Sequence, residues 1–301
     1  MERALVTGAS GLIGRHVAAA LSRRGFDVHG CARTSTDVLT VNMHRCNLLD
    51  VDAMRSLIEN VRPDVIVHCA WVTRHGAYWH SPENLDWLSS SVSLLRTAKL
   101  AGVRRFVGVG TCAEYEPSDN SAGHAAVAVG PPVTLYGTAK DALRRIGEKF
   151  AKVEGMEFAW ARVFMLYGAG EHQDRLVASL ARALVSGRPA RMSSGAVVRD
   201  FLDARDVGAA VAALAASTLE DCVDIGSGHG VSLRSLAERL AALSGRPDLL
   251  IAGSLPDRQN ESPMLIADAT RLKTELGFCP SIELDTGLTD VLEYWRKRGE
   301  P

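Results

Sequence analysis

Three glycines at the first junction between a strand and a helix constrain the fold of this chain more than any other feature. They lie in Thr7-Gly8-Ala9-Ser10-Gly11-Leu12-Ile13-Gly14, directly after the apolar run RALVT and at the start of the helical pattern GLIGRHVAAALSRRG. Gly8 permits a tight turn, Gly11 lets a pyrophosphate approach backbone N–H groups at a helix N-terminus, and Gly14 allows close packing of helix and strand. The G-x-x-G-x-x-G spacing therefore predicts a dinucleotide-binding turn; simple relief of a strand-to-helix turn is the alternative.

Short apolar runs alternate with longer amphipathic stretches through the first half of the chain. The runs are RALVT, FDVHGCA, VNMHRC, DVIVHCA, RRFVGVG and EFAWARV, and helical patterns such as NLDWLSSSVSLLRTAKLAG lie between most of them. Strands that read as continuous apolar runs are buried on both faces, as in a parallel sheet covered by helices on each side. The pattern predicts an α/β fold with a doubly wound parallel sheet of the Rossmann type.

The rhythm changes after about residue 164, where a Gly-rich turn and more polar segments follow. Further helical patterns lie near 173–187, 231–243, 269–276 and 285–298. We therefore expect a dinucleotide-binding Rossmann domain over 1–165, with 197–228 returning to it. Residues 166–196 and 229–301 are expected to form a smaller C-terminal substrate lobe.

Composition and charge exclude several classes of protein. The formal net charge is −1 with no run of like charges, so the chain lacks the basic surface of a nucleic-acid binder. No apolar stretch reaches the roughly 18 residues of a membrane span, and the N-terminus runs into a core strand without room for a signal peptide. We therefore expect a cytoplasmic protein with no nucleic-acid or membrane partner.

The cysteines are scattered along the chain. Cys31, Cys46, Cys69, Cys112, Cys222 and Cys279 form no C-x-x-C pair, and several lie inside apolar runs. In a reducing compartment this pattern favours small buried side chains over disulfides or zinc ligands. No metal site is predicted.

The end of the second apolar run bears on the choice of dinucleotide. It reads Val28-His29-Gly30-Cys31-Ala32-Arg33, without the acidic residue that binds the ribose of NAD. Arg33 stands there instead, with Thr34 and Ser35 beside it, and a guanidinium suits a 2′-phosphate. This favours NADP(H) over NAD; an ordinary surface arginine is the alternative.

Tyr136 and Lys140 are candidate catalytic residues. They lie four residues apart at the start of a helical pattern, so they share one helix face. An ammonium group nearby favours the phenolate of a tyrosine and brings it within reach of acid–base work at neutral pH. Thr111 follows the run RRFVGVG, at the carboxyl edge where ligands bind in open parallel sheets. Together the three predict a catalytic constellation.

The ordered set of motifs resembles the extended short-chain dehydrogenase/reductases, the family of sugar-nucleotide epimerases, dehydratases and reductases. The motifs are TGASGLIG, CNLLD, VHCAW, VGTCAEY, YGTAK, ARVFMLYGAGE, VRDFLDARDVG and DIGSG, and they follow the family's order over nearly the whole chain. The resemblance implies a Rossmann fold and an enzyme that acts on nucleotide sugars with a nicotinamide cofactor.

The resemblance implies a role for each matched residue. Thr111 and Tyr136 match the hydroxyl pair at the reacting carbon, and Lys140 matches the residue that binds the nicotinamide ribose and lowers the tyrosine pKa. Asn47 and Leu48 match the adenine-contacting pair; the family usually has Asp first, but the Asn carbonyl can also accept a hydrogen bond. The other residues implied to contact the cofactor are Gly8, Ser10, Gly11, Leu12, Ile13, Gly14, Arg33 and Ala70.

On the substrate side, Arg199 matches an arginine that binds the nucleotide diphosphate in relatives, and Arg258 in LPDRQNESP is a second candidate. Two guanidiniums offer forked donors suited to a diphosphate. The alternative for Arg199 is a salt bridge with Asp203 or Asp206.

Departures from the family's patterns narrow the reaction. Relatives that eliminate water carry an acid pair directly after the threonine, whereas Cys112 and Ala113 follow Thr111 here. Dehydration is therefore disfavoured, and Cys112 becomes a substrate-side candidate. Glu114 lies one strand position further on, so its side chain should point to the other face.

An aromatic and basic cluster follows the fourth apolar run. It consists of Trp71, Arg74, His75, Tyr78 and Trp79. Either these side chains contact a sugar or base, or the loop packs on its own aromatic rings.

The leading hypothesis is an NADPH-dependent reductase that acts on C4 of a nucleotide-linked 4-keto-6-deoxy sugar. A sugar-nucleotide 4-epimerase with tightly bound NAD uses the same groups, and Arg33 favours the reductase. A nicotinamide-sensing protein without turnover would not need Thr111, Tyr136 and Lys140 together. By analogy with the family, helices over 84–101 and 135–152 predict a homodimer.

Overall fold

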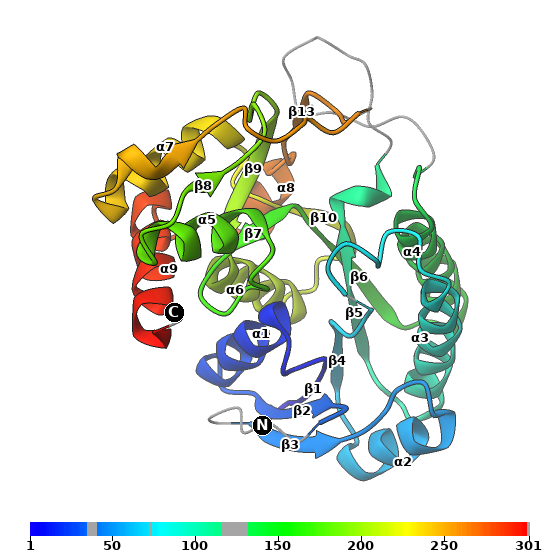
Figure 1. Ribbon diagram of the computed structural model, residues 1–301. Helices are drawn as coiled ribbons and strands as arrows, with labels where there is room; N and C mark the ends of the chain where they lie inside the picture. Colours follow the sequence, from blue (N-terminus) through cyan, green and yellow to red (C-terminus); the bar gives the residue numbers. More distant parts are fainter. Residues whose placement is uncertain (35–40, 73, 116–131, 260, 300–301) are drawn as a thin grey trace.

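The computed structural model describes residues 1–34, 41–72, 74–115, 132–259 and 261–299. Its centre is a seven-stranded sheet with the order β10-β6-β5-β4-β1-β2-β3 (Figure 1). Every neighbouring pair in this sheet is parallel. The strands are β1 (Arg3–Thr7), β2 (Asp27–Ala32), β3 (Asn42–Arg45), β4 (Val65–His68), β5 (Arg105–Thr111), β6 (Glu157–Val163) and β10 (Asp221–Ile225). The strand order reverses beside β1, which marks the expected ligand-binding edge.

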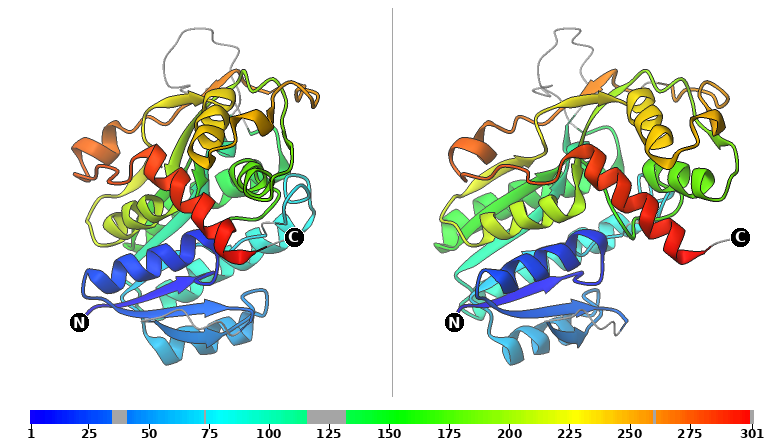
Figure 2. Two further views of the ribbon diagram at one scale, coloured as in Figure 1. Left: turned by 60° about the vertical axis from the view of Figure 1, so that its left-hand side comes forward. Right: turned by 90° about the vertical axis from the view of Figure 1, so that its left-hand side faces the viewer.

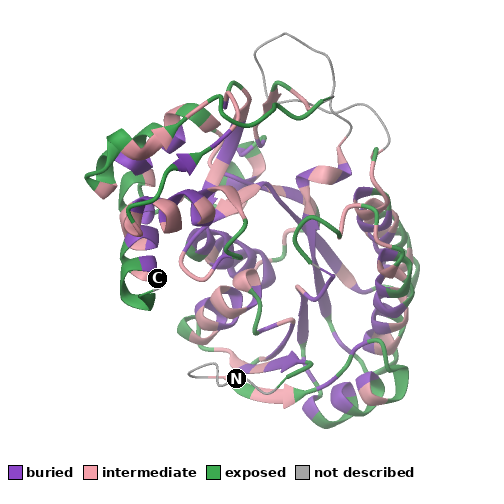
Figure 3. Cartoon of the chain, viewed as in Figure 1, coloured by how far each residue is buried: buried purple, intermediate pink, exposed green. Residues whose placement is uncertain are grey.

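Helices cover both faces of this sheet (Figures 1 and 2). On one face lie α1 (Leu12–Arg23) and α6 (Ala204–Ala215); on the other lie α2 (Val51–Val61), α3 (Glu83–Leu100) and α4 (Leu135–Glu154). The predicted doubly wound parallel sheet is thus confirmed. Burial is deepest along the central strands, while the outer helix faces are exposed (Figure 3).

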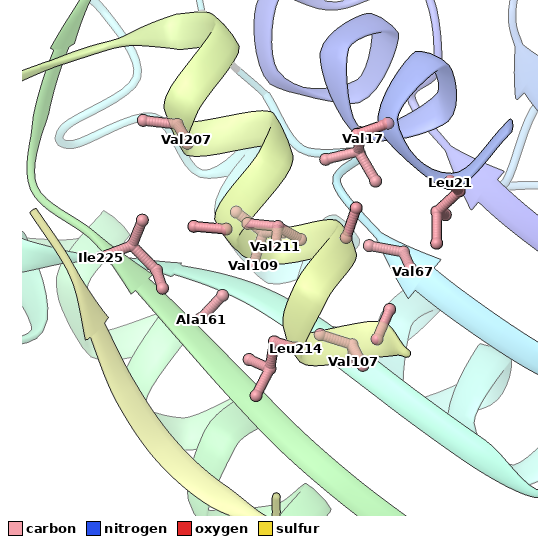
Figure 4. Packing of buried hydrophobic residues seen from close by; sticks show 14 of the residues in the cluster. Val17, Leu21, Val67, Val107, Val109, Ala161, Val207, Val211, Leu214 and Ile225 are labelled. Atoms are coloured by element: carbon pink, nitrogen blue, oxygen red, sulfur yellow. The ribbon is translucent and has the colours of Figure 1, made fainter. Parts of the chain in front are cut away.

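Alternate residues of each central strand enter different cores, because successive side chains point to opposite faces. In β1, Ala4 and Val6 pack under α1 and α6, whereas Leu5 packs on the side of α2 and α3. Figure 4 shows the first of these cores, where Val207 and Val211 of α6 lie over the sheet. Burial on both faces accounts for the continuous apolar runs in the sequence.

The remaining elements build a second, smaller body. A four-stranded sheet joins β7 (Met165–Tyr167), β9 (Val198–Asp203), β11 (Gly230–Ser232) and β13 (Met264–Leu265), and β8 (Ala190–Arg191) pairs with β12 (Leu250–Ile251). Its helices are α5 (Leu176–Val185), α7 (Leu233–Ser244) and α9 (Leu284–Arg298), with the short 3₁₀ turn η2 (Pro247–Leu249). The short helix α8 (Thr270–Thr274) instead packs in the core of the large sheet beside β10, and the 3₁₀ turn η1 (Cys112–Glu114) directly follows β5. Helices α5, α7 and α9 share one apolar core. No helix of the described residues is long and apolar enough to cross a membrane.

The expected return of 197–228 to the Rossmann domain needs one correction. Helix α6 and strand β10 do return to the large sheet, but β9 belongs to the small one. There it pairs with β7, β11 and β13. The sequence pattern of β9 cannot show which sheet the strand joins, because a strand is buried in either sheet.

Helix α1 lies unusually close to the turn that precedes it. A Cβ added at Gly14 would lie 2.2 Å from the carbonyl oxygen of Gly8, far inside van der Waals contact. The obstacle is backbone, which cannot rotate away as a side chain can. The glycine at this position is therefore required by packing.

We expect Gly14→Ala to lower the free energy of unfolding by about 1–3 kcal/mol, because overpacking displaces α1 from β1. Urea unfolding would measure this change. Arg23→Ala, at an exposed position at the end of the same helix, serves as control and should stay within about 0.5 kcal/mol of wild type. A Gly14→Ala variant as stable as the control would contradict the proposed steric requirement.

Candidate active site

The glycine turn and the end of β4 form one wall of the site. Gly8 has a φ of +66°, and a Cβ there would lie 2.9 Å from the backbone of Ala70. Gly11 is the N-cap of α1 and supplies no side-chain cap, so the helix N-terminus is free to bind an anion. Leu12 and Ile13 are partly exposed beside it, and Ser10 is exposed.

A chain of buried hydrogen bonds fixes this wall. The backbone N–H of Ala70 donates to the Thr7 hydroxyl, and Thr7 is 2.8 Å from Nδ1 of His68. His68 Nε2 lies 2.8 Å from the Ser91 hydroxyl, which itself donates to the carbonyl of Trp87. Burial lowers the pKa of His68 to about 3, so the ring is neutral and the chain of donors is continuous.

The residues expected at the adenosine end lie along the same edge. Arg33 directly follows β2 and is exposed, two positions beyond Cys31, whose carbonyl accepts from the N–H of Ala9 in the glycine turn. Asn47 is exposed and its side-chain oxygen accepts from the N–H of Leu49, while Leu48 is buried. The end of β2 lies beside the glycine turn. A ligand that extends from this turn along β2 would therefore reach Arg33.

Thr111 ends β5 and begins the turn η1. Its hydroxyl accepts from the N–H of Ala113, and its own N–H donates to Glu114 at 2.8 Å, which makes a capping box. The buried carboxylate of Glu114 also accepts from Trp160 and Arg162. Glu114 therefore turns toward β6 and fixes the backbone of Thr111.

Helix α4 is held directly against this turn. The Thr134 hydroxyl caps the helix by accepting from the N–H of Gly137 at 3.0 Å. A Cβ at Gly137 would lie 2.0 Å from the carbonyl oxygen of Ala113, so only glycine allows this approach. The contact brings Tyr136 and Lys140 beside Thr111.

The ring of Tyr136 is enclosed by the segment that follows β4. Tyr78 and Trp79 lie edge-on to it, with ring centroids 5.0 and 5.8 Å away. Burial raises the pKa of Tyr136 above its ordinary value, Tyr78 adds to the rise, and the Thr111 hydroxyl acts in the opposite direction. Burial thus sets the direction of this shift, and the lowering of the Tyr136 pKa by Lys140 stays a prediction. Tyr136 carries its proton at neutral pH.

Lys140 is buried at the base of the site. Its ammonium donates to the carbonyl of Val109 at 2.8 Å and lies 4.0 Å from the centre of the Trp71 ring. Burial lowers the pKa of Lys140 to about 8, while Glu114 and, after it, Cys69 act in the opposite direction.

The substrate-side candidates are Cys112, Arg199 and Arg258. Cys112 is buried, and its pKa is raised to about 12 by burial and Glu114, with Arg199 acting in the opposite direction. Arg258 is close enough to influence Tyr78. Arg199 therefore acts electrostatically on the residue after Thr111, and Arg258 on a ring that packs against Tyr136.

Arg199 already has a carboxylate partner. It is nearly buried and pairs with Glu261 at 2.9 Å, not with Asp203 or Asp206 as the alternative held. Asp203 binds Arg205, and Asp206 accepts from the backbone of Ser281 and Ile282. A diphosphate that binds Arg199 would have to share its guanidinium with Glu261 or displace that carboxylate.

Glu171, which follows β7, was not singled out from the sequence as a candidate site residue. Its side chain is buried, and within the described residues Oε2 has no hydrogen-bond partner. Its neighbour Arg175 lies 4.0 Å away, and burial raises the pKa of Glu171 to about 8. The neighbouring His172 stacks on His75, which joins this loop to the segment after β4. The only sequence signal was an acid directly after the turn YGAG.

Comparisons with known proteins agree with this geometry. A model of the NAD dependent epimerase/dehydratase family matches residues 4–226. The GDP-6-deoxy-D-mannose reductase of Pseudomonas aeruginosa is 27% identical, over 99% of this chain and 98% of that protein. A probable UDP-glucuronate 4-epimerase of Rhizobium meliloti is 25% identical, over 97% and 96%. The UDP-glucose 4-epimerase of Thermus thermophilus, solved in complex with NAD, shares the fold with a TM-score of 0.86 and 23% identity, over 98% and 99%.

The buried carboxyl of Glu171 predicts a pH-dependent stability difference. Its pKa is about 8 in the folded chain against 4.5 as an ordinary group, so the unfolded chain releases the proton first as pH rises. Wild type therefore loses stability between these values, whereas Glu171→Gln has no proton to lose. We expect the free energy of unfolding of Glu171→Gln, relative to that of wild type, to rise by at least about 1 kcal/mol from pH 4.5 to pH 8. Urea unfolding at each pH would measure this rise. The exposed Glu59→Gln should show a constant difference, and a constant difference in Glu171→Gln would refute the buried titration.

Proposed function

Because the chain belongs to the NAD dependent epimerase/dehydratase family, we propose that it is an NADPH-dependent reductase of a nucleotide-linked keto sugar. The proposed substrate is a nucleoside-diphosphate 4-keto-6-deoxyhexose, and the proposed reaction is reduction of the C4 carbonyl. The family match confirms the resemblance seen in the motifs. The similarity of the chain to a GDP-6-deoxy-D-mannose reductase over its full length supports a reductase.

The observation that carries this proposal is the arrangement of Thr111, Tyr136 and Lys140 at the carboxyl edge of the sheet. Tyr136 retains its proton because burial raises its pKa. It is therefore ready to donate that proton to the alkoxide that forms when a carbonyl is reduced. The Thr111 hydroxyl can donate to the same oxygen, and Lys140 lies one turn further along the same face of α4.

The residues of the glycine turn fit a dinucleotide. The helix N-terminus at Gly11 has no side-chain cap, and the approach of Gly8 to Ala70 keeps that edge clear of side chains. A nicotinamide cofactor bound there supplies the hydride. Arg33 supports NADP(H), since its exposed guanidinium at the end of β2 can pair with a 2′-phosphate.

Arg199 and Arg258 are proposed to bind the substrate diphosphate. Arg199 is held by Glu261 and Arg258 lies on the same loop as that carboxylate. Cys112 is proposed to face the sugar. Binding of UDP, dTDP, GDP and CDP by isothermal titration would test this assignment, and failure of all four would remove the sugar-nucleotide proposal.

A sugar-nucleotide 4-epimerase is the second candidate. The similarity to a probable UDP-glucuronate 4-epimerase favours it, and its chemistry would use Tyr136 and Thr111 as well. The two candidates differ in how they hold the cofactor: an epimerase keeps its NAD through each cycle. Denaturing the purified protein and identifying the released nucleotide would therefore separate them.

A homodimer through α3 and α4 is also proposed. These helices lie side by side, and their outer faces expose Leu85, Leu100 and Val153. Sedimentation of the purified chain would measure the oligomeric state.

Tyr136→Phe is expected to lower kcat for the keto sugar by about 10²–10⁴-fold, because it removes the proton donor. Cofactor affinity should change little, since the glycine turn is untouched. Stopped-flow turnover and cofactor titration would measure the two quantities. Retention of more than about a tenth of wild-type kcat would show that Tyr136 is not the acid.

Arg33→Ala is expected to weaken NADPH binding by roughly ten- to a hundredfold and to leave NADH much less affected. Losing a charge-assisted hydrogen bond costs on the order of 1.5–3 kcal/mol, and NADH offers only a hydroxyl at that place. Fluorescence titration of both cofactors would give the affinities. Arg24→Ala, an exposed charge at the far end of α1, is the charge-matched control. Equal affinities of wild type for the two cofactors would contradict the NADP assignment.

A further inference from the structure

Lys140 has few groups that can stabilise its charge. Among the described residues its ammonium donates one hydrogen bond, to the carbonyl of Val109, and the side chain is only 3% exposed. The ionisable groups that influence it are Glu114 from η1, and Cys69 and His68 from β4 and its end. His68 is neutral, and the pKa of Cys69 is raised to about 12, so Glu114 is the anion among them.

The face of Trp71 completes this environment. The ammonium lies 4.0 Å from the centre of the indole ring, within the range of a cation–π interaction. Such contacts gain strength when the cation is desolvated, as it is here. A ring in this position favours the charged lysine and also limits where its ammonium can move.

The indole is itself locked in place. Its Nε1 donates to the side-chain oxygen of Asn84 at 2.9 Å, and Asn84 is fully buried. The Asn84 amide nitrogen donates in turn to the carbonyls of Tyr78 and Ser81, at 2.7 and 2.8 Å. Both ends of this amide are satisfied, so the ring plane of Trp71 is set by directional bonds.

The same segment also encloses the other catalytic candidate. The backbone N–H of Tyr136 donates to the carbonyl of Trp79 at 3.1 Å, and the rings of Tyr78 and Trp79 lie edge-on to the phenol. One stretch of chain after β4 therefore touches both Tyr136 and Lys140. Asn84 ties the two contacts together, because it binds Trp71 and the backbone of Tyr78.

We propose that Trp71 is a positioning residue that holds the Lys140 ammonium through its ring face, with Asn84 fixing the ring. The inference rests on the proposed function for the catalytic importance of Lys140, but the contact itself is independent of it. The aromatic cluster after β4 thereby has a role that the sequence left open. This role differs from both alternatives considered from the sequence, which were contact with a sugar or base and packing of the loop on its own rings.

The contact can be tested without turnover. The chain has only six lysines, so protein labelled with ¹³C at lysine Cε gives six side-chain signals, and Lys140→Arg identifies one of them. Protons above an aromatic ring face are shielded, so the Lys140 signal of wild type should be displaced upfield from the other lysines. Its titration gives the midpoint directly.

Trp71→Leu removes the ring, so the upfield displacement should disappear and the midpoint should fall by about one pH unit. Site-specific fluorinated tryptophans at position 71 keep the shape of the ring while weakening the negative charge of its face. The midpoint should then fall stepwise with the number of fluorines, even if Trp71→Leu does not fold. A packing role alone predicts no change along the fluorinated series.

Trp87 supplies the matched control, since it is buried in the same cluster with its ring centroid 6.3 Å from that of Trp71. The same fluorination at Trp87 should leave the Lys140 midpoint unchanged. A Lys140 signal without ring shielding in wild type, or a midpoint insensitive to fluorination at Trp71, overturns the proposal. The pH profile of kcat/KM for keto-sugar reduction should shift with the midpoint; absence of turnover in wild type would instead refute the proposed function and leave the contact standing.

Discussion

The rest of the site depends on the hydrogen bonds of the buried Glu114 carboxylate. It accepts from the N–H of Thr111, from the indole of Trp160 and from the guanidinium of Arg162. Arg162 continues to Asp224 on β10, so one network of charges joins the carboxyl ends of β5, β6 and β10. Burial raises the pKa of Glu114 and Arg162 acts against this. Removing one partner of such a network leaves an uncompensated buried charge, which typically costs about 3–5 kcal/mol.

Burial sets the protonation of the groups around this network. It keeps Tyr136 protonated, holds His68 neutral and lowers the pKa of Lys140 towards neutrality. The three directions have one cause, since each charged form is disfavoured away from water. The site therefore has a neutral acid, a neutral hydrogen-bonded imidazole and one ammonium whose charge needs support from Glu114 and Trp71.

Local patterns in the sequence were enough to predict the central sheet, the glycine turn and the shared helix face of Tyr136 and Lys140. Each depends on a period of two or 3.6 residues or on a short motif. The partner of Arg199 could not be predicted, because Glu261 is 62 residues away and reaches it only through pairing of β9 with β13. The direction of the Tyr136 pKa was also beyond the sequence, because the spacing of Tyr136 and Lys140 does not give the burial of the phenol.

The acid–base residues and Arg199 are held by two kinds of contact. A ligand can displace one of these contacts but not the other. Helix α4 meets η1 through backbone, with Gly137 against the carbonyl of Ala113, so no ligand can compete for that contact. Arg199 is held by the side chain of Glu261, and a diphosphate can take the place of a carboxylate while preserving the charge pairing and the forked geometry. The acid–base groups are therefore preorganised, whereas the charge on the lobe side is available for exchange. Under the proposed function, the chemistry stays with α4 and η1, while the exchangeable charge at Arg199 serves to select the substrate.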